Sequence, residues 1–298
     1  MVKGDLVNKF ERHLIDVKKY SLHTVSAYIK DIAQLESSLN MAELTVPEAS
    51  HLHIRSWIVE LLDSGVSEKS INRKISSIRS YYNYLKRNGI VTTNPMQKVV
   101  APKIPKRLPK YVDKGKMAVI LDDPELVEHS YASAREMIVI NILYHTGMRR
   151  SELLSLTVQS FDLREGIVKV LGKGNKERII PLSSVIVKEL QGYLKIRTDT
   201  FSSTEPALIL TDKGKPAYPK LIYNIVSRVL KKYNASEKSS PHILRHTFAT
   251  HLTANGADLN AVKELLGHAS LAATQVYTHN SIERLKEVYD KAHPKSKS

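Results

Sequence analysis

The first ninety residues carry apolar side chains at the three- and four-residue intervals of amphipathic helices. Four helices are predicted, with these apolar positions: Leu6, Phe10, Leu14 and Val17; Val25, Ile29, Ile32 and Leu35; Trp57, Leu61 and Leu62; and Ile71, Ile75, Ile78, Tyr82 and Leu85. Ser21 is placed to cap the second helix, Gly65 ends the third, and Asn88-Gly89 ends the fourth. The pattern predicts an all-α helical bundle over residues 1–88.

From residue 113 to residue 298 the pattern predicts a mixed α/β domain that is mainly helical. Residues 131–145 form a strongly apolar helix that breaks at Thr146-Gly147, and a shorter helix carries Leu153 and Leu154. Residues 167–171 and 178–182 flank a Gly- and Lys-containing turn, which predicts a β-hairpin. Residues 207–210 give a weaker strand signal, and from Lys220 onward the pattern is helical.

Residues 89–112 are predicted to link the two domains. Pro102, Pro105 and Pro109 prevent a helix or a central strand there and favour an extended, semi-rigid chain.

The chain has 45 Lys and Arg against 30 Asp and Glu, and this charge of +15 favours a polyanionic partner. It contains no Cys, which excludes disulfides, thiolate metal sites and a Cys nucleophile. No apolar run has the roughly 18 residues of a membrane span, and the first residues do not resemble a signal peptide. We therefore expect a cytoplasmic protein without a membrane partner.

The basic residues are concentrated between Glu68 and Asp113, where no acidic residue occurs. An ordinary solvated face mixes both signs, so this stretch indicates contact with nucleic acid rather than a merely polar surface. The side chains expected to bind DNA are Lys69, Arg73, Arg79, Lys103, Lys106 and Arg107.

His242 and Arg245 form a cation pair that suits the binding of a phosphate. Ser240 is suited to cap a helix that begins at Pro241, so the two cations share a face near its N-terminus. A surface pair is the ordinary alternative. His242 and His246 also have the spacing of a zinc helix, but Ile243 stands where a metalloprotease has its Glu, so no metal is expected.

Four further residues have ordinary interpretations when each is taken alone. Arg149 and Glu152 suit a surface ion pair, and Lys173 suits an exposed hairpin turn that is not a P-loop. Tyr277 follows the helix end Leu265-Leu-Gly-His268, and a single Tyr usually packs in a core.

Taken together, six residues resemble the catalytic set of the tyrosine recombinases, the phage integrase family, in order and spacing. They are Arg149, Lys173, His242, Arg245, His268 and Tyr277. The chain resembles their Xer branch (XerC and XerD) most, in four further segments: residues 20–28, 106–109, 172–178 and 287–294. The similarity covers nearly the whole chain. One departure is Arg150, which stands where an aliphatic residue is usual; Arg149 keeps the Thr-Gly-x-Arg spacing.

The resemblance implies a C-shaped DNA clamp, with a SAM-like helical core-binding domain and a catalytic domain. It implies that Tyr277 attacks DNA to form a 3′-phosphotyrosyl link, while Arg149 and Arg245 bind the phosphate. Lys173 would protonate the 5′-oxygen, His242 would accept the tyrosine proton, His268 would donate a hydrogen bond, and Glu152 would orient its neighbours. No cofactor is implied, since the arginines do the work of divalent ions.

The implied biological role is the resolution of chromosome dimers at a dif-like site, in a nucleoid-associated tetramer of this chain alone or with a second recombinase. A C-terminal helix near Leu285 and Val288 would dock on a neighbour or close the chain's own core. An FtsK-type DNA translocase is a candidate further partner. The alternatives are an integrase or transposon recombinase of a mobile element, a type IB topoisomerase-like nickase, and a non-catalytic DNA-binding protein.

Overall fold

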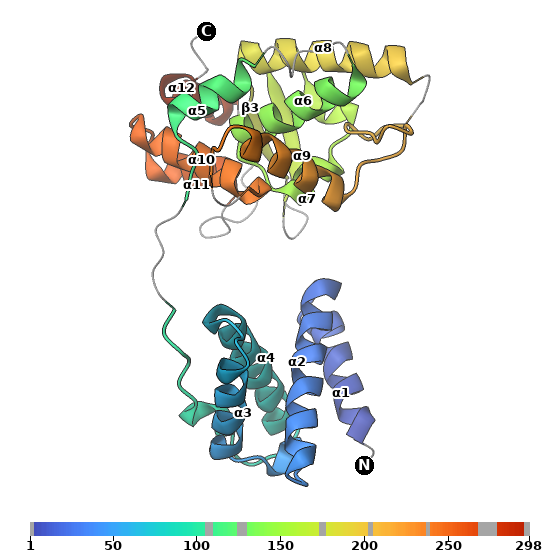
Figure 1. The fold of residues 1–298 in the computed structure, drawn as a ribbon, viewed down its shortest axis with the longest axis vertical. Helices are drawn as coiled ribbons and strands as arrows, with labels where there is room; N and C mark the ends of the chain where they lie inside the picture. Colours follow the sequence, from blue (N-terminus) through green and yellow to red (C-terminus); the bar gives the residue numbers. More distant parts are fainter. Residues whose placement is uncertain are drawn as a thin grey trace. The chain divides into compact units, whose positions relative to one another are not determined.

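The structure is a computed structural model that describes residues 3–104, 110–123, 130–172, 177–201, 205–236, 239–267 and 279–294. The chain forms two compact units, Met1–Arg107 and Leu108–Ser298, and each has its own hydrophobic core (Figure 1). The first unit is helical and the second combines helices with a small sheet, which confirms the predicted fold class.

The helical unit is built from four α-helices with short turns between them. These are α1 (Lys3–Arg12), continued by the π-helical turn η1 (His13–Val17), α2 (Leu22–Met41), α3 (His51–Asp63) and α4 (Glu68–Arg87), with the 3₁₀ turn η2 (Val46–Glu48) before α3. The hydroxyls of Ser21, Ser50 and Ser67 cap α2, α3 and α4, which confirms Ser21 as a cap. All five apolar positions predicted for α4 are buried.

The chain continues to pack on the helical unit after α4 ends. The 3₁₀ turn η3 (Pro95–Lys98) places Met96 and Val99 in that unit's core. Val112, by contrast, is buried in the core of the second unit, and its N–H donates to the Thr247 hydroxyl at 2.9 Å. The first part of the stretch 89–112 therefore packs on the helical unit, and its last residue packs on the second unit.

The described residues of the second unit include an antiparallel sheet of three strands in the order β1-β2-β3. They are β1 (Phe161–Asp162), β2 (Ile167–Leu171) and β3 (Glu177–Pro181). The β2–β3 pair confirms the predicted hairpin, with Val170 opposite Arg178, while β1 was not predicted. The weaker strand signal at 207–210 corresponds to isolated bridges, Thr157–Ala207 and Leu210–Pro216, rather than to a strand of the sheet.

Helices surround this sheet, and α6 is buried over most of its length (Figure 1). The helices are α5 (Lys114–Leu121), α6 (Tyr131–Thr146), α7 (Arg150–Ser155), α8 (Ser184–Thr200), α9 (Pro219–Lys232), α10 (Pro241–Ala254), α11 (Leu259–Leu266) and α12 (His279–Ala292), with the 3₁₀ turn η5 (Val158–Ser160) after α7. Gly147 and Gly267 adopt the left-handed conformation that ends α6 and α11, as predicted from sequence.

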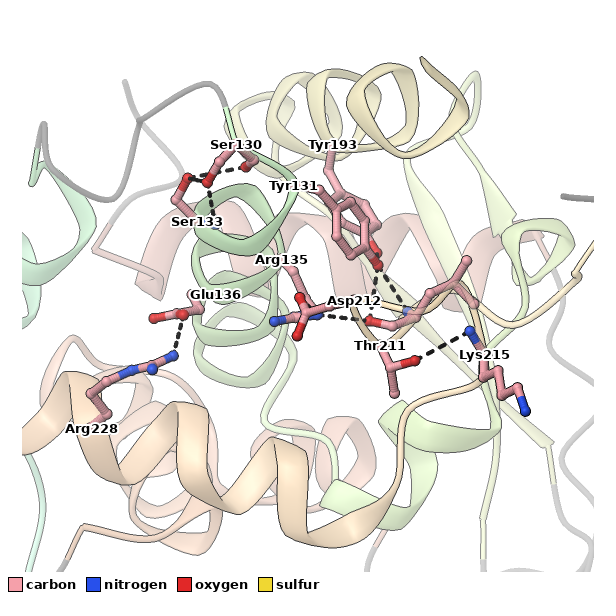
Figure 2. A network of polar contacts seen from close by, with 11 residues as sticks. Ser130, Tyr131, Ser133, Arg135, Glu136, Tyr193, Thr211, Asp212, Lys215 and Arg228 are labelled. Carbon is pink, nitrogen blue, oxygen red and sulfur yellow. Dashed lines mark hydrogen bonds and ion pairs between the residues drawn. The ribbon is translucent and has the colours of Figure 1, made fainter. Parts of the chain in front are cut away.

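A buried polar network attaches the start of α6 to the segment after residue 207 (Figure 2). The Tyr131 hydroxyl accepts the N–H of Leu210 at 3.0 Å. Arg135, only 4% exposed, donates to the Leu210 carbonyl at 3.2 Å and to Asp212 at 2.8 Å. This network is part of the scaffold and contains none of the predicted catalytic residues.

The C-terminal helix α12 packs on its own unit. Leu285, Tyr289 and Ala292 are buried in the core that also contains α6 and α10, whereas Val288 is only partly buried. In this chain Leu285 thus closes the protein's own core. Among the described helices, none has the length and apolar character needed to cross a membrane.

Candidate active site

Glu152 lies at the centre of the site and is 4% exposed, so it is not the surface partner that its sequence context suggested. It occupies the first turn of α7, where its carboxylate accepts the Arg149 N–H at 2.7 Å and the Arg149 guanidinium at 2.8 Å. Arg178 of β3 donates two parallel hydrogen bonds to the same carboxylate, at 3.0 and 2.8 Å. Such forked pairs fix direction as well as charge. Glu152 therefore holds Arg149 in one orientation.

The charge on Glu152 is maintained by its basic neighbours. Burial alone raises the pKa of a carboxyl, but the hydrogen bonds and charge of Arg178, followed by those of Arg149, outweigh it and lower the pKa of Glu152 to about 2. The carboxylate is therefore ionised at any physiological pH.

Arg245 approaches the same region from α10 and is 9% exposed. It donates to the Gly147 carbonyl at 2.8 Å and to the Leu266 carbonyl at 2.7 Å. These two bonds use only part of a guanidinium that has five N–H donors. Burial first, and then the nearby charge of Arg149, lower the pKa of Arg245 to about 10, which still leaves it cationic. The two arginines predicted to share a phosphate therefore lie within electrostatic reach of each other.

His242 lies one turn before Arg245 on α10 and is exposed. Partial shielding of the imidazole from water lowers its pKa first, and the positive charges of Arg150, His246, Arg245 and Arg149 lower it further. The imidazole is therefore neutral near pH 7 and can accept a proton. Pro241 is the first helical residue as predicted, but the Ser240 hydroxyl makes no capping bond, so the prediction of Ser240 as an N-cap was wrong in this respect.

Arg149 and Arg150 differ in how they are held. Arg149 is fixed by Glu152, whereas Arg150 makes a 3.5 Å contact with the Pro219 carbonyl. The arginine that keeps the Thr-Gly-x-Arg spacing is therefore the one fixed by a buried carboxylate.

Several predicted residues lie outside the described part of the chain. These are Lys173, His268 and Tyr277 of the catalytic set, and Lys106 and Arg107 of the DNA-binding set. In the sequence, Lys173 lies four residues before β3, and His268 comes directly after Gly267, which ends α11.

The other predicted DNA-binding residues lie in the helical unit. Lys69, Arg73, Arg79 and Lys103 are exposed. Arg73 of α4 binds Asp31 of α2, which is 1% exposed and also accepts from Lys74 at 2.9 Å and the Ser77 hydroxyl at 2.9 Å. Arg79 donates to the Val99 carbonyl at 3.4 Å. Arg73 and Lys74, with Lys30 and His23 of α2, line a shallow hollow.

Arg178 and Asp31 were missed as functional candidates, although both leave a signal in the sequence. Arg178 is two residues before the buried Ile180 and therefore points to the same side of β3, an unusual place for a charge. Asp31 precedes Ile32 and lies one turn before Leu35 within the apolar stripe of α2. A charged residue in an inward-facing position requires a partner.

The two histidines with zinc-helix spacing, His242 and His246, are both exposed on α10. Within the described ranges, no three His, Asp or Glu side chains gather in a way that could hold a metal ion.

Comparison with known proteins shows the family of this chain. Residues 111–284 match the phage integrase family, and residues 7–89 match the phage integrase N-terminal SAM-like domain. The chain is 38% identical to the tyrosine recombinase XerC of Pelobacter propionicus, covering 98% of this chain and 96% of that protein. It is 35% identical to the XerC of Listeria innocua, covering 99% of each.

Solved structures share the fold. The XerH recombinase in its pre-cleavage complex with difH matches with a TM-score of 0.70 at 24% identity, over 96% of this chain and 84% of that one. The Tn1549 transposon integrase bound to transposon end DNA matches with a TM-score of 0.74 at 20% identity, over 96% and 99%. The family match and the XerC relatives show an enzyme that breaks and rejoins DNA. The chain belongs to the phage integrase family and is a site-specific tyrosine recombinase, similar over its whole length to XerC proteins.

Proposed function

We propose that this recombinase acts through Tyr277 in Xer-type resolution of chromosome dimers at a dif-like site. The observation that carries the catalytic assignment is that Arg149, at the start of α7, and Arg245, on α10, lie near the buried Glu152 carboxylate, with His242 within electrostatic reach of both arginines. Two guanidinium groups suit the non-bridging oxygens of a phosphodiester, where negative charge grows during attack.

The reaction is an exchange of one phosphoester bond for another. The Tyr277 oxygen attacks the phosphorus, the bond to the 5′-oxygen breaks, and a 3′-phosphotyrosyl link forms. A tyrosine with a pKa near 10 needs a base, and a neutral His242 can take its proton. Lys173 gives a proton to the departing 5′-oxygen, and His268 donates a hydrogen bond to the phosphate. The 5′-hydroxyl of a partner strand then reverses the step without ATP.

The partners in this proposal are double-stranded DNA and other recombinase subunits. DNA is supported by the charge of +15 and by the acid-free stretch that contains Lys69, Arg73, Arg79, Lys103, Lys106 and Arg107. Subunits of this chain, or of a second tyrosine recombinase, would join in a tetrameric synapse near the nucleoid. An FtsK-type translocase is a further proposed partner, tested by adding one to a recombination assay.

A nicked suicide substrate with a dif-like site tests the assignment of Tyr277. The wild-type chain should form a covalent DNA–protein adduct even when excess EDTA is present throughout the reaction. Tyr277→Phe should bind the same DNA with unchanged affinity and form none. An adduct with Tyr277→Phe would overturn the assignment, and loss of the wild-type adduct in EDTA would point to metal-dependent chemistry.

Plasmids with one or two sites separate the related activities. Recombined products from two sites, and no relaxation of a one-site plasmid, are expected. Relaxation of the one-site plasmid would indicate a topoisomerase-like nickase. Recombination at element ends but not at the chromosomal site would assign the chain to a mobile element.

A further inference from the structure

Arg178 is a buried cation that the proposed reaction leaves without a role. It is 5% exposed, and its guanidinium makes two hydrogen bonds to Glu152, at 3.0 and 2.8 Å. Its Nε donates a third, at 3.0 Å, to the Leu265 carbonyl near the end of α11. A buried guanidinium is stable only when it is paired in this way. Arg178 therefore joins β3, α7 and α11 through one planar group.

Each segment that Arg178 joins lies within a few residues, in the sequence, of a proposed catalytic residue. Through Glu152 it reaches Arg149, which the same carboxylate binds at 2.8 Å. In the sequence it is five residues after Lys173, and its partner Leu265 is three residues before His268. We therefore expect a shift of Arg178 to displace Arg149 through Glu152, and to disturb the chain segments that lead to Lys173 and His268.

Gly267 makes the contact between α11 and Arg178 tight. Its φ of +65° is a left-handed conformation, and a Cβ at this position would lie 3.0 Å from the Arg178 Cδ and 3.2 Å from its Nε and Nη1. A side chain here would therefore press on Arg178 as well as strain the backbone. The end of α11 rests directly on the Arg178 side chain.

We propose that Arg178 is a positioning residue for the recombination reaction. Its hydrogen bonds hold Arg149, through Glu152, and the end of α11 in one arrangement. This inference rests on the proposed function. A lysine at 178 would keep the charge but not the fork, because an ammonium is a point charge without the planar geometry needed for three directed bonds. Arg178→Lys should therefore leave DNA bound and slow the chemical step.

Arg135 offers a control in the same unit. It is also buried, at 4% exposed, and it also donates to a carboxylate and to a backbone carbonyl, but both acceptors, Asp212 and Leu210, lie in one segment and the Asp212 side chain is 73% exposed (Figure 2). Arg178→Lys should reduce the single-turnover cleavage rate at saturating DNA by about 10- to 100-fold, with the DNA dissociation constant unchanged. Arg135→Lys should lower the melting temperature and keep the rate within about twofold of wild type.

Glycine substitutions test the same contact while Arg178 is kept. Gly267→Ala forces a Cβ against Arg178, whereas Gly256→Ala meets the same backbone strain, with φ of +88°, and has nothing within 4 Å of the new Cβ. Only Gly267→Ala should slow cleavage. This pair keeps the test open even if Arg178→Lys folds poorly.

Two results would overturn the proposal: wild-type cleavage by Arg178→Lys at saturating DNA, or equal slowing in the Arg135→Lys and Gly256→Ala controls. Failure of the proposed function gives a different result, namely a covalent adduct with Tyr277→Phe or none with the wild-type chain. The two failures are therefore distinguishable in one assay.

Discussion

A buried carboxylate lies among basic side chains in both units, but the two clusters differ in how firmly their cations are held. In the helical unit, Asp31 accepts from Arg73, Lys74 and the Ser77 hydroxyl. In the catalytic unit, Glu152 accepts from Arg149 and Arg178. The carboxylates are 1% and 4% exposed, so burial of the acid does not distinguish the clusters.

The clearest difference lies between Arg73 and Arg178. The Arg73 side chain is 46% exposed and can turn to water or to a phosphate, whereas the Arg178 side chain is 6% exposed and cannot. The second cations, Lys74 at 12% and Arg149 at 34%, lie between these two values. Contact with a DNA backbone requires charge in the right region, while attack on phosphorus requires groups held to a fraction of an ångström. We therefore propose that the same device serves electrostatic attraction in one unit and fixed geometry in the other.

Removing each carboxylate charge should give the largest contrast. Glu152→Gln leaves Arg178 buried without its anion, so we expect the free energy of unfolding to fall by about 3 kcal/mol. Because Arg149 also loses its support, single-turnover cleavage at saturating DNA should fall by at least about 100-fold. Urea unfolding and quenched-flow cleavage measure the two effects.

Asp31→Asn is the matched variant. Arg73 can reach solvent, and Lys74 keeps a hydrogen bond to Gln34 at 2.6 Å, so the free energy of unfolding should fall by only about 1 kcal/mol, and saturating cleavage should stay within about twofold of wild type. If Asp31→Asn slowed cleavage as much as Glu152→Gln, the two clusters would not differ in function.

A smaller effect is expected from Arg73 alone. Arg73→Ala should weaken DNA binding and lower the slope of log affinity against log salt by about one, since one phosphate contact releases about one counterion. Cleavage at saturating DNA should not change. Arg55→Ala is the control, because Arg55 is an exposed arginine of the same unit outside the acid-free stretch. An unchanged salt slope in Arg73→Ala would remove Arg73 from the DNA surface.

The Glu152 ion pair also predicts a pH dependence of stability. Because the pKa of Glu152 is lowered from 4.5 to about 2 in the folded chain, its contribution is complete above pH 4.5 and is lost as the pH falls toward 2. The stability difference between wild type and Glu152→Gln should therefore shrink across this window in urea titrations. A constant difference from pH 6 to pH 3 would contradict the buried ion pair.

Local patterns predicted most of the fold. The Ser21 cap, the breaks at Gly147 and Gly267 and the β2–β3 hairpin depend on neighbours in the sequence, and all are present. Helices α5 and α8 were not predicted, and β1 was too short to leave a signal. The Ser240 hydroxyl does not cap α10, because a favourable residue type does not by itself set side-chain direction.

Residue type and order predicted which residues form the site. They did not predict the hydrogen bonds and ion pairs that connect those residues. Arg149 and Glu152 looked like a surface pair because their spacing gives no information on burial. Arg178 became visible only when β3 and α7 were brought together, since its partners are 26 and 87 residues away. Such long-range pairs depend on tertiary packing, which a single sequence does not record.

The most direct test of the account is to identify the residue that carries the DNA after cleavage. A covalent adduct trapped on a nicked substrate can be digested with trypsin and nuclease, and the modified peptide sequenced by mass spectrometry. We predict that the nucleotide is attached to Tyr277. Attachment to any other of the fourteen tyrosines, or to a residue of another type, would contradict the account.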